Sequence, residues 1–141
     1  MLIHLERPLP GVAAIILNRP EKRNALNIAL LEDLFNSIVE FNQDTSLRVI
    51  ILKGNGAVFC SGLDLSEAAD PTLAKYSANL IKMTFSALYN SPHITIAEVQ
   101  GAAMAGGAGL MCACDFAVAA QDAKFGFPET QRGLVAAMVL T

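Results

Sequence analysis

Two glycine-bearing segments of the sequence could present main-chain N–H groups to a negatively charged oxygen. Residues 57–65 read Ala-Val-Phe-Cys-Ser-Gly-Leu-Asp-Leu, and residues 101–110 read Gly-Ala-Ala-Met-Ala-Gly-Gly-Ala-Gly-Leu. Glycine lets the backbone turn sharply and approach a ligand without a Cβ in the way. The second segment also opens a predicted helix, whose first N–H groups lack internal partners and carry partial positive charge. This pattern favours an oxyanion site made of backbone amides.

The strands that must carry these segments are marked by short apolar runs between turn residues. They are predicted at residues 3–5, 12–17, 49–52, 94–99 and 116–119. Each glycine-bearing segment follows one of these buried strands. Because the strands alternate with helical patterns, the sequence predicts an α/β domain with largely parallel strands.

Three helices are predicted between the strands. Asn27 can cap the first helix, Pro71 opens the second, and the third is rich in glycine and alanine and ends near Cys114. The buried face of the first helix is predicted to carry Leu31, Leu34, Phe35, Ile38 and Phe41. The buried face of the second is predicted to carry Leu73, Tyr76, Leu80, Met83 and Ala87.

Length and composition narrow the class of protein. The 141 residues suit one domain, and a net charge of −3 without a basic cluster argues against a nucleic-acid partner. The longest apolar run, residues 102–114, is shorter than the about 20 residues that cross a membrane. No export signal is visible at the N-terminus, so a cytoplasmic location is expected. Cys60, Cys112 and Cys114 are then expected to be reduced, small, buried residues.

Other chemistries fit the residues less well. A serine hydrolase would need Gly-x-Ser-x-Gly, but Phe59 stands two residues before Ser61, and neither His4 nor His93 has a triad context. A dinucleotide site would need Gly-x-Gly-x-x-Gly, which residues 106–109 do not match. The cysteines and histidines lack the spacing of a zinc site.

Four motifs in a fixed order resemble one enzyme family. Residues 59–65 resemble the Phe-x-x-Gly-x-Asp-Leu/Ile segment of the crotonase (enoyl-CoA hydratase/isomerase) superfamily, and residues 101–110, leading to Cys114-Asp115, resemble its glycine-rich helix start. Residues 18–27 resemble its first loop, and residues 124–129 its Phe-Gly-x-Pro-Glu stretch. The motifs cover almost the whole chain. The resemblance implies a crotonase-like ββα spiral fold whose C-terminal helical region is missing.

The resemblance implies catalytic roles for three positions. The N–H groups of Leu63 and Gly106 would form an oxyanion hole that stabilises a thioester as it becomes an enolate. Glu129, which follows Pro128, would be the carboxylate that moves protons. The alternative for Glu129 is an exposed cap near a helix start, since Pro-Glu commonly opens helices.

The resemblance also implies substrate contacts. Lys22, Arg23 and Ala25 match the loop that follows the coenzyme A phosphates and pantetheine, and Asp64 and Leu65 match the turn on the adenine side. The alternative for Lys22 and Arg23 is a solvated polar loop. Coenzyme A would enter as part of the substrate thioester, and neither a separate cofactor nor a metal is implied.

The match departs from a typical hydratase at one position. The family's second glutamate would stand three residues after Gly106, where this sequence has Gly109. Water addition uses one carboxylate to activate water and another to manage the α-proton, whereas a lone carboxylate fits proton transfer between carbons. A single glutamate at position 129 is typical of enoyl-CoA isomerases, so hydratase and isomerase both stay open. Ala137 replaces the aspartate of some dienoyl-CoA isomerases and a dehalogenase, which disfavours those activities.

Two expectations concern the whole protein. Residues 1–141 are expected to be a crotonase core without the C-terminal trimerisation helices, and full-length family members form homotrimers or hexamers. The family serves fatty-acid and other acyl-CoA metabolism.

The alternative function, favoured by Gly109 and by the short chain, is a catalytically impaired acyl-CoA-binding or assembly subunit.

Overall fold

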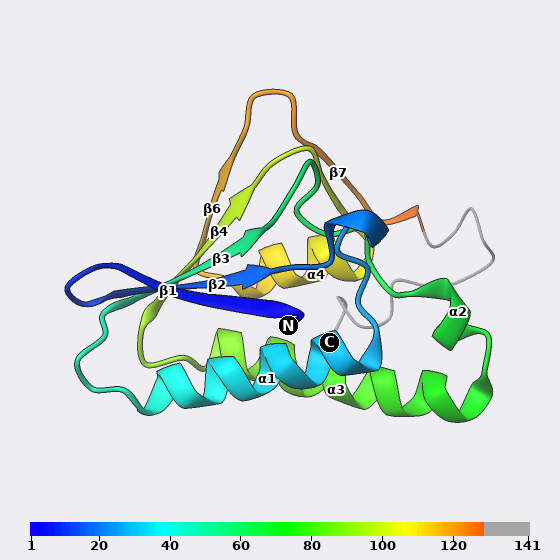
Figure 1. The fold of residues 1–141 in the computed structure, drawn as a ribbon, viewed down its shortest axis with the longest axis horizontal. Coiled ribbons are helices and arrows are strands. Elements are labelled where there is room, and N and C mark those ends of the chain that lie inside the picture. The colour runs from blue at the N-terminus through cyan, green and yellow to red at the C-terminus, as the bar shows by residue number, and fades with distance from the viewer. Residues whose placement is uncertain (129–141) are drawn as a thin grey trace.

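The computed structural model describes residues 1–128 as a sheet with helices packed against it (Figure 1). Within these residues the elements are β1 (Ile3–Leu9), β2 (Val12–Leu17), the 3-10 helix η1 (Pro20–Lys22), α1 (Ile28–Gln43), β3 (Val49–Gly54), α2 (Leu65–Ala68), α3 (Pro71–Tyr89), β4 (Ile94–Val99), β5 (Ala102–Met104), α4 (Gly106–Ala113), β6 (Phe116–Ala119) and β7 (Lys124–Gly126). The predicted α/β class is confirmed. The short elements α2, β5 and β7 were not predicted from the sequence.

The main sheet has five strands in the order β1-β2-β3-β4-β6. β1 and β2 form an antiparallel hairpin, and β2, β3, β4 and β6 run parallel to one another, as predicted. β5 and β7 form a separate parallel pair. Because parallel strands end at the same edge, the segments that follow β3 and β4 emerge side by side.

α1 begins where the sequence predicts. The Asn27 side chain accepts a hydrogen bond from the Leu30 N–H at 3.1 Å, and the Glu67 carboxylate accepts one from the Ile28 N–H at 2.7 Å. The predicted buried face is confirmed except at Phe35, which is half-buried. The helix is therefore fixed to α2 at its start and to the core along its length.

The predicted buried face of α3 is wrong at three of its five positions, whereas Leu80 is buried as predicted and Ala87 is half-buried. Leu73, Tyr76 and Met83 are 38%, 47% and 46% exposed. The buried positions of the helix are Ser77, Leu80, Ile81, Thr84 and Leu88. The Ser77 and Thr84 hydroxyls donate to the carbonyls of Ala74 and Leu80 in the helix itself, so these short polar residues can be buried with their hydrogen bonds satisfied.

The core lies between the sheet and the helices. α1 and α3 pack against each other along one side of the sheet (Figure 1), and α4 contacts α3 and β4. The largest fully buried side chains include Phe59, Ile15, Leu17, Leu34 and Leu52.

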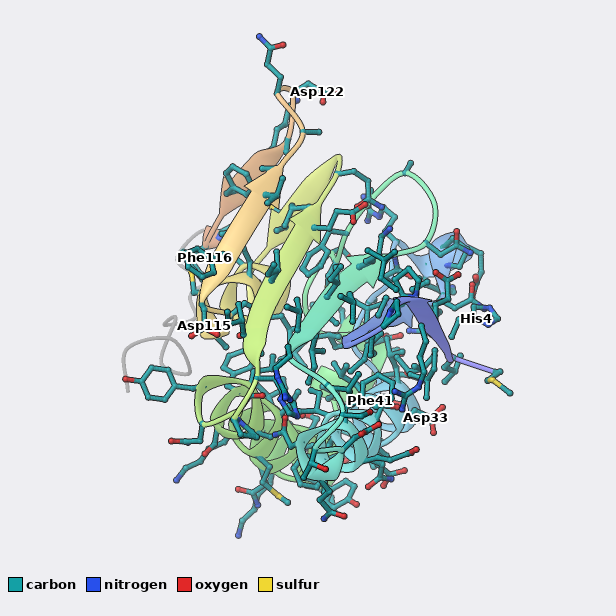
Figure 2. The ribbon with its side chains drawn as sticks, turned by 90° about the vertical axis from the view of Figure 1, so that its left-hand side faces the viewer. His4, Asp33, Phe41, Asp115, Phe116 and Asp122 are labelled. Atoms are coloured by element: carbon teal, nitrogen blue, oxygen red, sulfur yellow. The ribbon has the colours of Figure 1, made fainter. Side chains whose placement is uncertain are left out.

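The segment around β6 lies at the outside of the molecule. Figure 2 shows Phe116 on this edge strand and Asp122 at the far end of the connection that follows it. The Asp115 carboxylate, just before β6, accepts hydrogen bonds from the Thr95 N–H at 2.8 Å and from the Thr95 hydroxyl at 2.9 Å. This contact joins the end of α4 to the start of β4.

Candidate active site

The two glycine-bearing segments lie against each other, although 35 residues lie between them in the sequence. The Cys60 N–H donates to the Ala102 carbonyl at 3.1 Å, and the Met104 N–H donates to the Cys60 carbonyl at 3.0 Å. Cys60 and Ala103 accordingly form an isolated parallel bridge. These bonds fix the register between the two segments just before Gly62 and Gly106.

Gly62 and Gly106 meet beyond this bridge. A Cβ built on Gly62 would lie 2.9 Å from the Ala105 Cβ and 3.3 Å from the Gly106 nitrogen, and Gly62 has a φ of +94°. Glycine is required there because any side chain would be both strained and blocked.

The backbone nitrogens of Leu63 and Gly106 are therefore neighbours. A Cβ built on Gly106 would lie 3.8 Å from the Leu63 nitrogen, so covalent geometry limits the separation of the two nitrogens to about 6 Å. One oxygen can accept hydrogen bonds of about 2.9 Å from two donors that lie no more than about 5.8 Å apart. Within residues 1–128, neither N–H donates a hydrogen bond. We call Gly62, Leu63, Ala105 and Gly106 the paired-amide site.

Ala105 holds the turn that starts α4. Its φ of 49° and ψ of −118° are an uncommon conformation for a residue with a Cβ, which costs about 1–3 kcal/mol. The Ala105 N–H donates to the Gly126 carbonyl at 2.8 Å, and its carbonyl accepts from the Gly109 N–H at 2.9 Å. β7 and α4 thus hold the strained residue that sets the direction of the Gly106 amide.

Two other glycines of α4 serve close packing. A Cβ on Gly107 would collide with the carbonyl of Cys60 and lie 2.8 Å from the Cys60 Cβ. A Cβ on Gly109 would lie 2.5 Å from Cζ and 2.7 Å from Cε2 of Phe85 in α3. Because both neighbours occupy the Cβ position, α4 approaches the segment before Gly62 on one side and α3 on another.

The first loop is hydrogen-bonded to the paired-amide site. The Ser61 N–H donates to the Arg23 carbonyl at 3.0 Å, the Leu26 N–H to the Gly62 carbonyl at 2.8 Å, and the Asp64 N–H to the Leu26 carbonyl at 3.0 Å. The loop that carries Lys22, Arg23 and Ala25 therefore borders Leu63. The Lys22 and Arg23 side chains are exposed, and Ala25 is half-buried.

Asn24 was missed by the sequence reasoning. Its side chain is fully buried, its Nδ2 lies 2.8–3.1 Å from the carbonyls of Asn55, Val58 and Phe59, and its Oδ1 accepts from the Arg19 N–H at 2.8 Å. The signal was present: Asn24 has a φ of 52°, and asparagine is enriched at positive φ. Asn24 thus joins the first loop to the strand end that precedes Cys60.

Asp64 has an ion-pair partner within the protein. Arg19 Nη1 lies 2.6 Å from Asp64 Oδ2, and both side chains are largely buried. The Ser66 hydroxyl and the Arg19 guanidinium, each hydrogen-bonded to the carboxylate, lower the pKa of Asp64 to about 2. Asp64 also caps α2 by accepting from the Ser66 N–H, and the following Leu65 is 57% exposed. The carboxylate is therefore ionised and fixes the turn on which Leu63 lies.

Glu129 and Ala137 lie outside the described residues. The segment that leads to Glu129 is described as far as Pro128, and β7 holds it beside β5. The Lys124 N–H donates to the Gly101 carbonyl at 2.9 Å, and Phe127 is 40% exposed. The last described residues, 127 and 128, therefore directly follow β7, the strand whose Gly126 carbonyl accepts a hydrogen bond from the Ala105 N–H.

The cysteines behave differently from one another. Burial raises the pKa of the Cys60 thiol to about 12, and its Sγ donates to the Asn24 carbonyl at 3.2 Å. Burial also raises the pKa of Cys114 to about 12. The prediction of a buried cysteine is wrong for Cys112, which lies on the outward face of α4 and is exposed. Within residues 1–128, no His, Cys, Asp and Glu side chains group closely enough to hold a metal ion.

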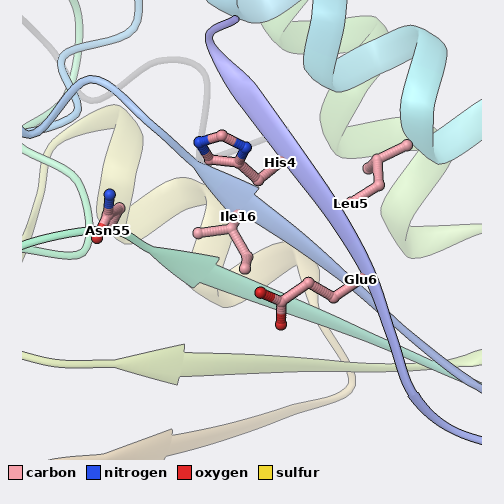
Figure 3. A pocket seen from close by; sticks show the side chains of 5 residues that line it. All are labelled: His4, Leu5, Glu6, Ile16 and Asn55. Carbon is pink, nitrogen blue, oxygen red and sulfur yellow. The ribbon is translucent and has the colours of Figure 1, made fainter.

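Two surface pockets lie elsewhere. One of about 380 Å³ is bordered by His4 and Glu6 of β1, with Leu5, Ile16 and Asn55 (Figure 3). Another of about 490 Å³ lies between α1 and α3 and includes Phe35 and Met83 in its lining. Neither pocket is lined by a residue of the paired-amide site.

In the described part of the chain, no helix has the length and hydropathy to cross a membrane.

Comparison with known proteins decides the family. The family model described as enoyl-CoA hydratase/isomerase matches residues 9–141. The chain belongs to the enoyl-CoA hydratase/isomerase family. Family relatives include 2,3-dehydroadipyl-CoA hydratase of Escherichia coli, 39% identical over 126 residues that cover 88% of this chain and 49% of that protein. They also include enoyl-CoA isomerase/hydratase fer4 of Mycosarcoma maydis, 37% identical over 138 residues that cover 90% of this chain and 50% of that protein.

Solved structures of the family show the same fold. The crystal structure of enoyl-CoA hydratase from Bacillus anthracis superposes with a TM-score of 0.94 at 35% sequence identity, covering 98% of this chain and 55% of that chain. The predicted crotonase fold is confirmed. The chain spans about half the length of the family relatives that it matches.

Proposed function

We propose that this protein processes acyl-CoA thioesters and that the Leu63 and Gly106 N–H groups stabilise the enolate oxygen. The observation that carries the proposal is the proximity of these two nitrogens, since a Cβ on Gly106 would lie 3.8 Å from the Leu63 nitrogen. Removal of a proton next to the thioester carbonyl moves negative charge onto the carbonyl oxygen. Two fixed donors stabilise this charge, and loss of one typically costs about 3–4 kcal/mol.

The fixed backbone around the site supports this role. Arg19, Asp64 and Leu26 hold the residues on either side of Leu63, and the Ala105 turn holds Gly106. Donors that are already in place need no reorganisation when charge develops, so their effect falls on the transition state. The start of α4 adds the partial positive charge of a helix N-terminus.

We assign the remaining roles by the resemblance to the family. Lys22, Arg23 and Ala25 border the paired-amide site and are proposed to lie along coenzyme A, and Asp64 and Leu65 are proposed to form the turn at its adenine end. Glu129 is proposed as the base that takes the α-proton and returns it. Coenzyme A belongs to the substrate in this scheme.

The test measures turnover of 2-enoyl-CoA and 3-enoyl-CoA by the protein expressed from its complete reading frame. Turnover of either thioester is expected. Gly106→Val should abolish thioester binding by filling the site, and Glu129→Gln should abolish turnover while leaving binding intact. Unchanged affinity in Gly106→Val would remove the paired-amide site from the proposal, and full turnover in Glu129→Gln would remove that carboxylate.

A second candidate is a catalytically impaired acyl-CoA-binding or assembly subunit. It is favoured by Gly109, which supplies no second carboxylate. Tight binding of an acyl-CoA thioester without turnover of any enoyl substrate would support this candidate over the first. The homotrimer or hexamer expected for the full-length family is a further proposal, which sedimentation of the encoded protein would test.

A further inference from the structure

Asn55 is the only asparagine of the sequence that is followed by glycine. The side-chain carbonyl carbon of an asparagine can be attacked by the main-chain nitrogen of the next residue, and glycine hinders this attack least because it has no Cβ. The Asn55–Gly56 pair directly follows β3, and both residues are exposed. The Asn55 side chain also lines the open surface pocket beside β1 (Figure 3), so water reaches it.

The main-chain groups of this pair favour the attack. The Gly56 N–H donates no hydrogen bond to any atom of the described residues, so its nitrogen is available to react. The Asn55 carbonyl accepts a hydrogen bond from Asn24 Nδ2 at 2.9 Å. Because that carbonyl belongs to the same peptide group as the Gly56 nitrogen, a donor at its oxygen stabilises the negative charge that remains when the nitrogen loses its proton.

Asn18 restrains the side chain that is attacked. Asn55 Nδ2 donates to Asn18 Oδ1 at 2.8 Å, which holds the side-chain amide of Asn55 in one orientation. The side chain must leave this orientation to let its carbonyl carbon turn toward the Gly56 nitrogen. A neutral hydrogen bond at the surface adds little net free energy, so it slows the reaction without preventing it.

We propose that Asn55 is a site of spontaneous conversion to aspartate and isoaspartate, and that Asn18 slows this conversion. The Gly56 nitrogen bonds to Asn55 Cγ and loses its proton, the Cγ–Nδ2 bond breaks, and ammonia leaves with that proton. A cyclic imide remains. Water then adds to one of the two imide carbonyl carbons and opens the ring, which leaves aspartate or isoaspartate at position 55.

Isoaspartate lengthens the main chain at a point where the chain is held on both sides. Gln100 Nε2 donates to the Gly54 carbonyl at 2.6 Å and to the Gly56 carbonyl at 2.9 Å. In isoaspartate the side-chain methylene becomes part of the main chain, so the spacing of these two carbonyls increases. One amide nitrogen can then no longer bond both of them within hydrogen-bond distance.

The longer chain acts on the paired-amide site through Asn24. Asn24 Nδ2 also lies 2.8 Å from the Val58 carbonyl and 3.1 Å from the Phe59 carbonyl. Displacement of the Asn55 carbonyl therefore disturbs the donor that fixes the segment leading into the paired-amide site. The expected loss of turnover rests on the proposed function, whereas the conversion of Asn55 does not.

The first experiment warms the protein expressed from its complete reading frame at mildly alkaline pH and follows each asparagine by peptide mapping and mass spectrometry. Asn90 is the control. It is exposed and its amide donates to the Ser86 carbonyl at 2.9 Å, but the following Ser91 has a Cβ and donates its N–H to the Leu88 carbonyl. Conversion at Asn55 should be at least about tenfold faster than at Asn90. Equal rates would overturn the proposal.

The variant Asn18→Ala tests the restraint. Loss of the acceptor frees the Asn55 side chain, so conversion at Asn55 should accelerate about fivefold while the rate at Asn90 stays unchanged. An unchanged rate at Asn55, or an equal acceleration at both asparagines, would overturn the restraint by Asn18.

The consequence of the conversion is measured as turnover of the enoyl thioesters. Turnover by the warmed protein should fall in proportion to its isoaspartate fraction and recover after repair with protein isoaspartate methyltransferase. Asn55→Asp adds the charge at an exposed position without the longer chain, so it should keep most of its turnover. Asn55→Gln is the matched control and should lose no turnover on warming. Full turnover at a high isoaspartate fraction would overturn the proposed effect on the site.

The urea midpoint separates this inference from the proposed function. It should fall as the isoaspartate fraction rises, because the bonds from Gln100 and Asn24 are disturbed in every converted molecule. If the fresh protein turns over neither thioester, the proposed function fails and the midpoint alone decides the inference. A midpoint that does not change with the isoaspartate fraction would show that the longer chain is accommodated and would overturn it.

Discussion

Adjacent glycines in α4 are expected to respond in opposite ways to the same added methyl group. A Cβ on Gly106 would lie 3.3 Å from the flexible end of Leu26 and 3.8 Å from the Leu63 nitrogen, which is the space proposed for the thioester oxygen. A Cβ on Gly107 would collide with the Cys60 carbonyl. Gly106→Ala should therefore impair catalysis, and Gly107→Ala should impair folding.

The magnitudes follow from these contacts. In Gly106→Ala the Leu26 methyl can move by a few tenths of an ångström, so the free energy of unfolding should change by less than about 1 kcal/mol. Displacing the oxygen from one donor should raise the barrier by about 3 kcal/mol, which lowers kcat/KM about 10²-fold. In Gly107→Ala a backbone carbonyl must shift, which should lower the free energy of unfolding by about 1–3 kcal/mol.

The assays are thioester turnover and urea unfolding of both variants. Gly107→Ala, measured where it remains folded, should retain most of its kcat/KM, since its methyl group points toward Cys60 and away from Leu63. A Gly106→Ala variant with unchanged kcat/KM would refute the placement of the oxyanion site. A Gly107→Ala variant as stable as the unmodified protein would refute the close packing of α4 against Cys60.

Three further predictions concern the surroundings of the site. Asn24→Asp should lower the free energy of unfolding by about 3 kcal/mol, seen as a lower urea midpoint at unchanged slope, because the buried carbonyls near Asn24 lose their donor. The pKa of Asp64 lies at about 2, below its ordinary 3.8, so the stability that this carboxylate adds is complete above about pH 4 and disappears as the pH falls to 2. Asp64→Asn should therefore flatten the acid limb of a stability–pH curve, and an unchanged limb would contradict the Arg19 ion pair. An aromatic disulfide reagent at about pH 8 should modify exposed Cys112 quickly and Cys60 only after unfolding, because burial raises the pKa of Cys60 to about 12.

Local patterns predicted the elements better than they predicted which faces are buried. The α1 face was predictable because large apolar residues at helical spacing coincide with the buried side, which ends at Phe41. The α3 face was not, because Ser77 and Thr84 satisfy their hydroxyls within the helix and so can replace apolar residues at the buried positions. Tyr76 instead donates to Glu32 of α1 at 2.8 Å from an exposed position.

The sequence by itself determined the α/β class, the family and the two glycine-bearing segments, because these depend on residue types at short spacings. Only the tertiary structure decided which atoms meet: that Gly62 adjoins Gly106, that Asn24 joins the first loop to the strand end before Cys60, and that Phe85 fills the space beside Gly109. These contacts join residues 24 to 44 positions apart, and helix packing and sheet register set them. Such packing is a property of the whole chain, and no local pattern in the sequence encodes it.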